Sequence, residues 1–403
     1  MLFNKIKNTI TRFRMLEPGD RVVISVSGGP DSVCLLSALH ALSAELKIHL
    51  YIAHLDHMFR GNESALEARF VDNLAKKLGI PATIEHIDVP AFCRARGLSP
   101  QAGAREVRYS FLNRVAQAVS AVRIATGHTA TDQAETFLMR LLRGAGAAGL
   151  SAIPPVRGNI IRPLIESTRD EVMDYLRTTN LSYVTDPSND KALYTRNRIR
   201  LELMPVLKQF NPRIEETLAS EAGMLREEDE ATAVHLETIM QCIFTKDKDI
   251  LTLMRDKFNV LPLAFRRRIF RSITALAGLV SSDMSLVQTD EALAFMTTSQ
   301  SGRSLSLPCG LQLEREYDRF IISEASVTQD FSYALALPGT TIIPDLGLAV
   351  EMQLMEEREA HSERENNLWQ AVFDYDKISP ILTVRNRRPG DWFCPSGMGG
   401  RSK

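Results

Sequence analysis

The sequence predicts an α/β fold: a doubly wound parallel sheet in an amino-terminal domain, followed by a helical domain and a small mixed α/β domain at the carboxyl end. The first observation behind this prediction is an alternation. Short runs of β-branched and apolar residues alternate with segments whose apolar residues recur at helical spacing, an order typical of parallel strands joined by crossover helices. The second is composition. The chain has 403 residues, of which 44% are hydrophobic and 24% charged, as in an ordinary globular protein with ample core.

The elements of the predicted sheet domain follow one another regularly. An amphipathic helix within residues 1–20 ends at a Pro-Gly-Asp turn. The predicted strands are 22–26, 48–53, 82–87 and 122–126, and the predicted helices begin near residues 30, 63, 102, 131 and 168. Ligands of such sheets collect at the carboxyl ends of the strands, so polar residues at those ends are the first candidates for a site.

The composition changes after Pro212, and we expect three domains: 1–212, 213–325 and 326–403. Residues 213–300 are charged and helical in pattern, short strands with turn signals follow in 304–355, and 356–367 is a polar linker. Residues 384–391 resemble the start of a known carboxyl-terminal RNA-binding domain, and this resemblance implies that the chain stops at Lys403 inside that domain.

The stretch from Ser27 to Ser32 has the character of an anion site. It lies between a β-branched run and a helical apolar run, which predicts strand, tight turn and helix. Two adjacent glycines allow positive φ and let backbone N–H groups approach phosphate oxygens. Proline suits the first helical turn, and the helix amino terminus adds partial positive charge. The candidate phosphate-binding residues here are Ser27, Gly28, Gly29, Pro30, Asp31 and Ser32.

Asp31 is unusual in this loop because it places a negative charge beside an expected anion site. A carboxylate repels a bound phosphate unless a divalent cation lies between them, which makes the acid a candidate metal ligand. The stretch fits neither the Walker loop nor G-x-G-x-x-G. As S-G-G-x-D-S, it resembles the PP-loop of the ATP pyrophosphatase family, whose members cleave ATP between the α and β phosphates.

Further polar residues follow the second and fourth predicted strands. Asp56 and His57 come after the second strand, and Gly127 and His128 after the fourth. Asp132 and Glu135 are three residues apart at a helix start, so they share a face that suits Mg²⁺ or an ammonium group. The alternative is helix capping by Thr131 or Asp132, with Glu135 completing a capping box. The spacing of the histidines does not favour a zinc site.

Arginines form a third group of candidates. Arg105 and Arg108 share a helix face, and Arg196 and Arg200 lie one helical turn apart. A solvated basic face and a contact with nucleic acid or a carboxylate are equally compatible with such runs. The basic run 266–268 has two equally compatible interpretations of its own: contact with the phosphates of a nucleic acid, and packing on a neighbouring helix.

These motifs together resemble the tRNA(Ile)-lysidine synthetase family across about the first 212 residues. The matching pieces, in order, are Ser-Gly-Gly-Pro-Asp-Ser, Asp56-His57-x-x-Arg60, Ala104-Arg105-x-x-Arg108-Tyr109, Gly127-His128, Asp132-Gln133-x-Glu135-Thr136, Leu138–Gly144, Asp186-x-Ser188-Asn189 and Arg196-Asn197-x-Ile199-Arg200. In that family, ATP adenylates O2 of the wobble cytidine of an isoleucine tRNA with the anticodon CAU. The ε-amino group of free lysine then displaces AMP and gives lysidine.

The resemblance implies roles for residues of this chain. It implies a catalytic set of Asp31, Asp132, Glu135 and Arg200. ATP is expected at the PP-loop with His57, Gly127 and His128, and Mg²⁺ at Asp31 and Asp132. Lysine or tRNA is expected at Arg105, Arg108, Asp132, Glu135, Arg196 and Arg200. One departure is Thr131, because many relatives carry two acidic residues where this chain has Thr131-Asp132; we expect Asp132 to suffice.

The remaining features bear on cell compartment and on competing functions. Five cysteines without paired spacing favour a reducing compartment, and there is no signal peptide or membrane-length apolar run. We therefore expect a cytoplasmic protein without a membrane partner, and a homodimer is a candidate assembly. The alternatives are a PP-loop tRNA thiolase, which needs reactive or paired cysteines, and a non-catalytic tRNA-binding protein.

Overall fold

A computed structural model describes most of the chain. The described residues are 2–59, 62–185, 195–248, 250–279, 284–324, 331–344, 347–355, 373–378, 381–386 and 391, without the side chains of 62–65. The chain divides into two compact units, residues 1–239 and 240–403. The three-part division with boundaries after 212 and 325 remains a proposal.

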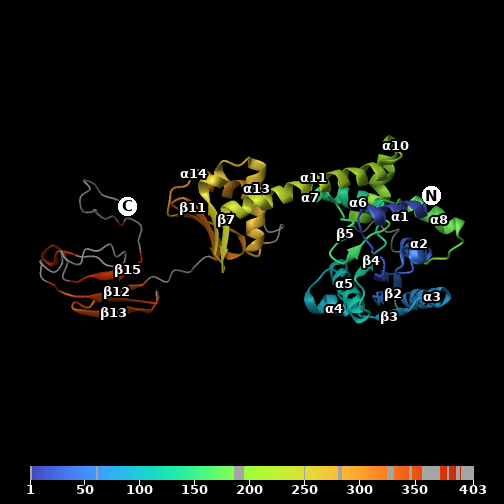
Figure 1. The fold of residues 1–403 in the computed structure, drawn as a ribbon, viewed down its shortest axis with the longest axis horizontal. Helices are drawn as coiled ribbons and strands as arrows, with labels where there is room; N and C mark the ends of the chain where they lie inside the picture. The colour runs from blue at the N-terminus through green and yellow to red at the C-terminus, as the bar shows by residue number, and fades with distance from the viewer. Residues whose placement is uncertain are drawn as a thin grey trace. The chain divides into compact units, whose positions relative to one another are not determined.

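Unit 1 contains the predicted parallel sheet (Figure 1). Its strands are β1 (Arg21–Ser25), β2 (His49–Asp56), β3 (Ala82–His86), β4 (Arg123–Ala125), β5 (Val156–Arg157) and β6 (Ile160–Ile161). The strand order is β3-β2-β1-β4-β6-β5, and every pair except the β5–β6 hairpin is parallel. The chain runs outward on one side through β2 and on the other through β4. The gap between β1 and β4 is therefore the topological switch point at which such sheets bind ligands.

Helices cover both faces of this sheet, as a doubly wound fold requires. The helices of unit 1 are α1 (Leu2–Arg12), α2 (Pro30–Leu46), α3 (Asn62–Leu78), α4 (Val89–Arg96), α5 (Pro100–Ala118), α6 (Ala130–Leu141), α7 (Ala147–Leu150), α8 (Arg169–Thr178), α9 (Thr195–Arg198), the π-helix η2 (Ile199–Leu203), α10 (Met204–Phe210) and α11 (Ile214–Ile243), whose last residues reach unit 2.

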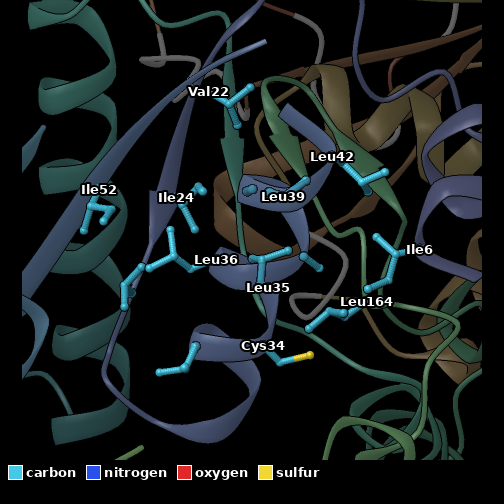
Figure 2. Packing of buried hydrophobic residues seen from close by; sticks show 14 of the residues in the cluster. Ile6, Val22, Ile24, Cys34, Leu35, Leu36, Leu39, Leu42, Ile52 and Leu164 are labelled. Carbon is cyan, nitrogen blue, oxygen red and sulfur yellow. The ribbon is translucent and has the colours of Figure 1, made fainter. Parts of the chain in front are cut away.

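Successive residues of β1 point to opposite faces and build two separate cores. Val22 and Ile24 pack with the apolar face of α2 and with Ile6 and Leu164 (Figure 2). Val23, which lies between them, packs with the apolar face of α5. Because both faces are buried, the strand is a continuous apolar run, which is the pattern that predicted it.

Several element boundaries differ from the prediction. The first helix ends at Arg12, and β2 extends to Asp56, so that Asp56 ends the strand instead of following it. The helix α4 and the β5–β6 hairpin were not predicted. Each strand of that hairpin has only two residues, too few to show a period.

Unit 2 begins with strands where a helical region was expected. Its antiparallel sheet has the order β7-β8-β11-β10-β9, with bounds β7 (Phe244–Asp247), β8 (Ile250–Met254), β9 (Arg303–Ser306), β10 (Leu311–Glu316) and β11 (Arg319–Glu324). Its helices are α12 (Arg255–Asn259), α13 (Leu263–Leu276) and α14 (Leu286–Thr298). Within the basic run, Arg267 donates to both carboxylate oxygens of Asp290 on α14 at 2.7 and 2.8 Å, so this residue supports the packing interpretation.

Two small two-stranded sheets complete the described part of unit 2. One pairs β12 (Ser332–Ala334) with β15 (Thr383–Arg385), and the other pairs β13 (Gly339–Ile343) with β14 (Leu348–Met352). The predicted linker 356–367 lies outside the described residues. No helix in the described segments is long and apolar enough to cross a membrane.

Candidate functional site

Three helices begin at the carboxyl ends of β1 and its neighbours. α2 starts after β1 and α6 after β4, and a Cβ atom on Gly127 would lie only 3.1 Å from the carbonyl carbon of Asp31. The backbone of Ala130 at the start of α6 donates to the carbonyl of Ser167, just before α8, at 2.7 Å. The amino termini of α2, α6 and α8 therefore lie close together, and each contributes positive potential that favours an anion.

The predicted strand, tight turn and helix are present between β1 and α2. Gly28 has a φ of +90°, in the region that glycine enters without strain. The Ser32 hydroxyl accepts from the backbone N–H of Ser27 at 3.2 Å and donates to the carbonyl of Gly29 at 2.9 Å. Pro30 occupies the first turn of α2, and Gly29 at its N-cap supplies no side-chain cap. The loop is thus held by its own hydroxyl groups, while the helix end stays uncapped by a side chain.

Asp31 lies at the first turn of α2, facing the other acids of the site. Burial, and then the charge of Asp132, raise the pKa of Asp31 to about 6. One carboxylate oxygen, Oδ1, is buried without a hydrogen-bond partner among the described residues. The other, Oδ2, lies 3.9 Å from Nη1 of Arg169. A half-buried carboxylate with one buried, unpartnered oxygen and a second acid nearby fits a divalent cation.

Asp132 and Glu135 are held by arginines. Nε of Arg196 lies 2.6 Å from Oε2 of Glu135, and its Nη2 lies 2.6 Å from Oδ1 of Asp132. Nε of Arg200 lies 2.6 Å from the other oxygen of Glu135, whose side chain has no exposed surface. Burial opposes the charge of both guanidinium groups, but the carboxylates outweigh it and raise the pKa of Arg196 and of Arg200.

The capping interpretation correctly predicted a capping box at the start of α6 but assigned it to the wrong residues. Thr129, and neither Thr131 nor Asp132, is the N-cap of α6. Asp132, and not Glu135, completes the capping box, because its Oδ2 accepts from the backbone N–H of Thr129 at 2.8 Å. Capping and site geometry are therefore compatible: one oxygen of Asp132 caps α6 and the other contacts Arg196.

Arg200 lies on the π-helix η2. Single π-helical turns frequently occur at functional sites, because the extra residue changes the direction in which side chains point. Here the turn lies between α9 and α10 and leaves both Arg196 and Arg200 directed at Glu135.

The two predicted histidines are neutral near pH 7. Burial, followed by the charge of Arg108, lowers the pKa of His57 to about 4. Burial likewise lowers the pKa of His128 to about 4, and its Nδ1 lies 3.0 Å from the hydroxyl of Thr126. A neutral imidazole still donates one hydrogen bond, which suits a contact with a nucleotide.

Arg105 and Arg108 lie on α5, as predicted. Arg105 is exposed, with its guanidinium 5.0 Å from the ring centre of Tyr109. Arg108 is close enough to act electrostatically on both His57 and His128. Arg60, Asp186, Ser188 and Asn189, which also carried the resemblance, lie outside the described residues.

Sequence reasoning missed three polar residues at this edge of the sheet: Arg162, Arg169 and Glu215. Arg162 is 2% exposed, directly follows β6 and donates to the carbonyl of Pro154 at 2.6 Å. Polar residues at strand ends are candidates for a site, so Arg162 would have been a candidate if the two-residue strand β6 had been predicted. Glu215 accepts from the Thr131 hydroxyl at 2.6 Å, across a sequence separation that no local pattern reveals.

Comparison with known proteins places this geometry in a family. A family model described as a PP-loop domain matches residues 2–207. The chain is 35% identical to the tRNA(Ile)-lysidine synthase of Symbiobacterium thermophilum, over all of this chain and 86% of that protein. It is 32% identical to the tRNA(Ile)-lysidine synthase of Clostridioides difficile, over 97% of this chain and 86% of that protein. It is 34% identical to the tRNA(Ile)-lysidine synthase of Geobacillus kaustophilus, over 100% of this chain and 87% of that protein. The chain belongs to the tRNA(Ile)-lysidine synthase family, within the PP-loop ATP-utilising enzymes.

Proposed function

We propose that this chain is a ligase that joins free lysine to C2 of the wobble cytidine of the CAU-anticodon isoleucine tRNA, with conversion of ATP to AMP and pyrophosphate. One observation carries the proposal: the PP-loop leads into the amino terminus of α2, which has no side-chain cap, and lies beside the cluster of Asp132, Glu135, Arg196 and Arg200. One side of the site suits the phosphates of ATP and the other suits an amino acid.

The first step is adenylation of the base. O2 of the cytidine attacks the α-phosphorus of ATP, the bond from that phosphorus to the oxygen bridging to the β-phosphorus breaks, and pyrophosphate leaves with the electron pair. The backbone of Ser27–Ser32 and the amino terminus of α2 bind the phosphates. His57, Gly127 and His128 form the adjoining wall in this proposal.

A divalent cation belongs to this step. Asp31, with its unpartnered Oδ1, and Asp132 would hold Mg²⁺. Bound there, Mg²⁺ supplies positive charge to the departing pyrophosphate. Nucleotide sites commonly hold this ion with only one or two carboxylates and phosphate oxygens. Among the described residues, no three His, Cys, Asp or Glu side chains are grouped as a metal site.

The second step replaces the adenylate by lysine. The bound ε-ammonium group first loses a proton to solvent, and the resulting amine attacks C2. The C2–O2 bond then breaks, AMP leaves with O2, and the nitrogen loses a second proton to solvent. Asp132 and Glu135 would attract the ammonium of the incoming lysine, and an arginine would bind its carboxylate. Because Arg196 contacts Asp132, lysine binding at Asp132 exchanges that contact. Arg105 and Arg108 are proposed to contact tRNA.

The thiolase alternative has less support from the cysteines. Cys34 and Cys93 are buried, and burial raises the pKa of Cys34 to about 12, so its thiol is far from the thiolate needed for sulfur transfer. A cytoplasmic location and a homodimer are further parts of the proposal, the first because tRNA and ATP are available there.

Mass spectrometry of nucleosides tests the function directly. The protein is incubated with the tRNA, ATP, Mg²⁺ and isotope-labelled lysine, and the tRNA is then digested. We expect a cytidine derivative that carries the lysine label, together with one pyrophosphate per modified base. Modification that requires a sulfur donor instead of lysine would identify a thiolase, and pyrophosphate release under neither condition would leave a binding protein.

A further inference from the structure

Arg169 is a cation of the site to which neither the sequence motifs nor the proposed steps assign a role. It is the first residue of α8, which has ten residues and a capping box formed by Thr168 and Glu171. Its backbone N–H donates to the hydroxyl of Thr131 at 3.1 Å. This bond fixes the start of α8 beside α6, so that the Arg169 side chain reaches Asp31 in the PP-loop.

The contacts of Arg169 differ from those of the other two arginines near Asp31. Arg196 and Arg200 each lie 2.6 Å from a carboxylate oxygen of Glu135. Among the described residues, the one ion pair of Arg169 is with Asp31, at 3.9 Å, which is too long for a hydrogen bond. Its side chain is 38% exposed, as is that of Arg196, against 25% for Arg200. Of the two arginines in the described part of the chain whose charge acts on Asp31, Arg169 and Arg200, Arg169 is thus the one that remains available for a ligand.

We propose that Arg169 binds the β and γ phosphates of ATP and stabilises the departing pyrophosphate. This inference rests on the proposed function and names the residue that receives the leaving group. As the bond to the α-phosphorus breaks, negative charge grows on the pyrophosphate oxygens, and a guanidinium is suited to two such oxygens at once. The amino termini of α2 and α8 favour the same charge.

The competing explanation is that Arg169 serves only as counter-ion to Asp31. It does lower the pKa of Asp31, against the larger effect of burial. A counter-ion acts only while Asp31 is charged, so its removal would have no effect on pyrophosphate binding in Asp31→Asn. A group that binds the terminal phosphates would affect ATP and pyrophosphate but not AMP, which lacks them.

Calorimetry on the full chain separates the two explanations. Binding of ATP with Mg²⁺, of AMP and of inorganic pyrophosphate is measured for the unsubstituted protein, Arg169→Ala and Arg169→Gln, and binding of pyrophosphate is also measured for Asp31→Asn with and without Arg169→Gln. The matched control is Arg177→Ala, at the other end of α8, whose side chain is 77% exposed and pairs with Asp174. Thermal unfolding of each variant verifies the fold, and Arg169→Gln, which keeps a polar side chain without the charge, provides the measurement should the alanine variant not fold.

We expect both Arg169 variants to bind ATP and pyrophosphate about tenfold or more weakly, the scale of one charge-assisted hydrogen bond, with AMP within about twofold. Arg177→Ala should match the unsubstituted protein. Equal weakening of ATP and AMP, no weakening, or an effect of Arg169→Gln on pyrophosphate that disappears in Asp31→Asn would overturn the proposal. Nucleoside analysis of the unsubstituted protein reports separately on the reaction: if it makes no lysidine yet shows the ATP–AMP split, the proposed function fails and Arg169 still binds the phosphates.

Discussion

Nε of Arg196 lies 2.6 Å from Oε2 of Glu135, a carboxylate without exposed surface. Arg200 contacts the other oxygen of the same carboxylate. A buried ion cluster of this kind is stable only as a set, because removing one member leaves the others desolvated and uncompensated. Glu135 therefore ties α6 to α9 and η2, in addition to the role proposed for it with lysine.

Glu135→Ala should lower the free energy of unfolding by about 3–5 kcal/mol, since it leaves two partly buried guanidinium groups without their carboxylate. Urea unfolding followed by circular dichroism measures this loss. Glu202→Ala is the matched control, because Glu202 forms an exposed i,i+4 pair with Arg198 and should cost less than about 0.5 kcal/mol. Similar losses in the two variants would show that Glu135 is not an anchor.

The same substitution is expected to impair lysine transfer more than adenylation. The Asp31 side of the site keeps the PP-loop and its hydroxyl contacts, whereas the lysine side loses its acid. Tests at a temperature where Glu135→Ala remains folded compare pyrophosphate release with incorporation of labelled lysine. Equal loss of both steps would contradict this division of roles.

Asp31→Asn should stabilise the protein while abolishing ATP turnover. Because the folded pKa, about 6, lies above the ordinary 3.8, the stability that Asp31 contributes is fully present below about pH 4 and is lost as pH rises through about 6. The uncharged variant should therefore exceed the natural protein in stability above pH 6, by at most roughly 3 kcal/mol, and equal it below pH 4. Denaturant unfolding at both pH values measures the difference.

Turnover by the natural protein should rise as pH increases through about 6, because the ionised form of Asp31 is the one that would hold a cation. Lysine-dependent pyrophosphate release across this range reports the profile. Residual turnover in Asp31→Asn, or greater stability of the natural protein at neutral pH, would contradict the assignment.

Local periodicity predicted the individual strands and helices, and a six-residue motif predicted the PP-loop, because each of these depends on residues close together in the chain. The N-cap of α6 was harder to predict, because Thr129, Thr131 and Asp132 are all residue types that favour helix ends. Which of them caps the helix depends on the backbone conformation, which the sequence does not show. Helical spacing placed Arg196 and Arg200 on one face, but their partner lies more than 60 residues earlier. Contacts across such distances are set by tertiary packing and leave no periodic signal in a single sequence.

Gly127→Ala should weaken ATP binding by displacing the PP-loop. An added Cβ would lie 3.1 Å from the carbonyl carbon and oxygen of Asp31 and 3.2 Å from the nitrogen of Ser32. These are backbone atoms, so the loop itself must shift, at a cost of about 1–3 kcal/mol in unfolding free energy. Calorimetry with ATP should show a higher Kd. Gly146→Ala, with no atom within 4 Å of the added Cβ, should leave ATP affinity unchanged; equal effects in the two variants would exclude steric displacement.

Thr131 contacts Glu215 and α8, and its hydroxyl is directed to neither oxygen of Asp31. It donates to Oε2 of Glu215 at 2.6 Å and accepts from the backbone of Arg169 at 3.1 Å. Glu215 in turn pairs with Lys208 at 2.7 Å and is 9% exposed. An acid at position 131 would therefore face a buried carboxylate in this chain, which is a physical reason for threonine here.

Thr131→Asp should lower the free energy of unfolding by about 2 kcal/mol or more at neutral pH, because two carboxylates then meet where a hydroxyl donated a hydrogen bond. The loss should shrink in acid, where one of the two is protonated. Thr131→Ser keeps the donor and serves as control. Combining Thr131→Asp with Glu215→Gln removes the repulsion, so a double-mutant cycle should show a coupling of about 1 kcal/mol or more in favour of the pair. Additive losses would mean that the two side chains do not interact, and the threonine would then lack this explanation.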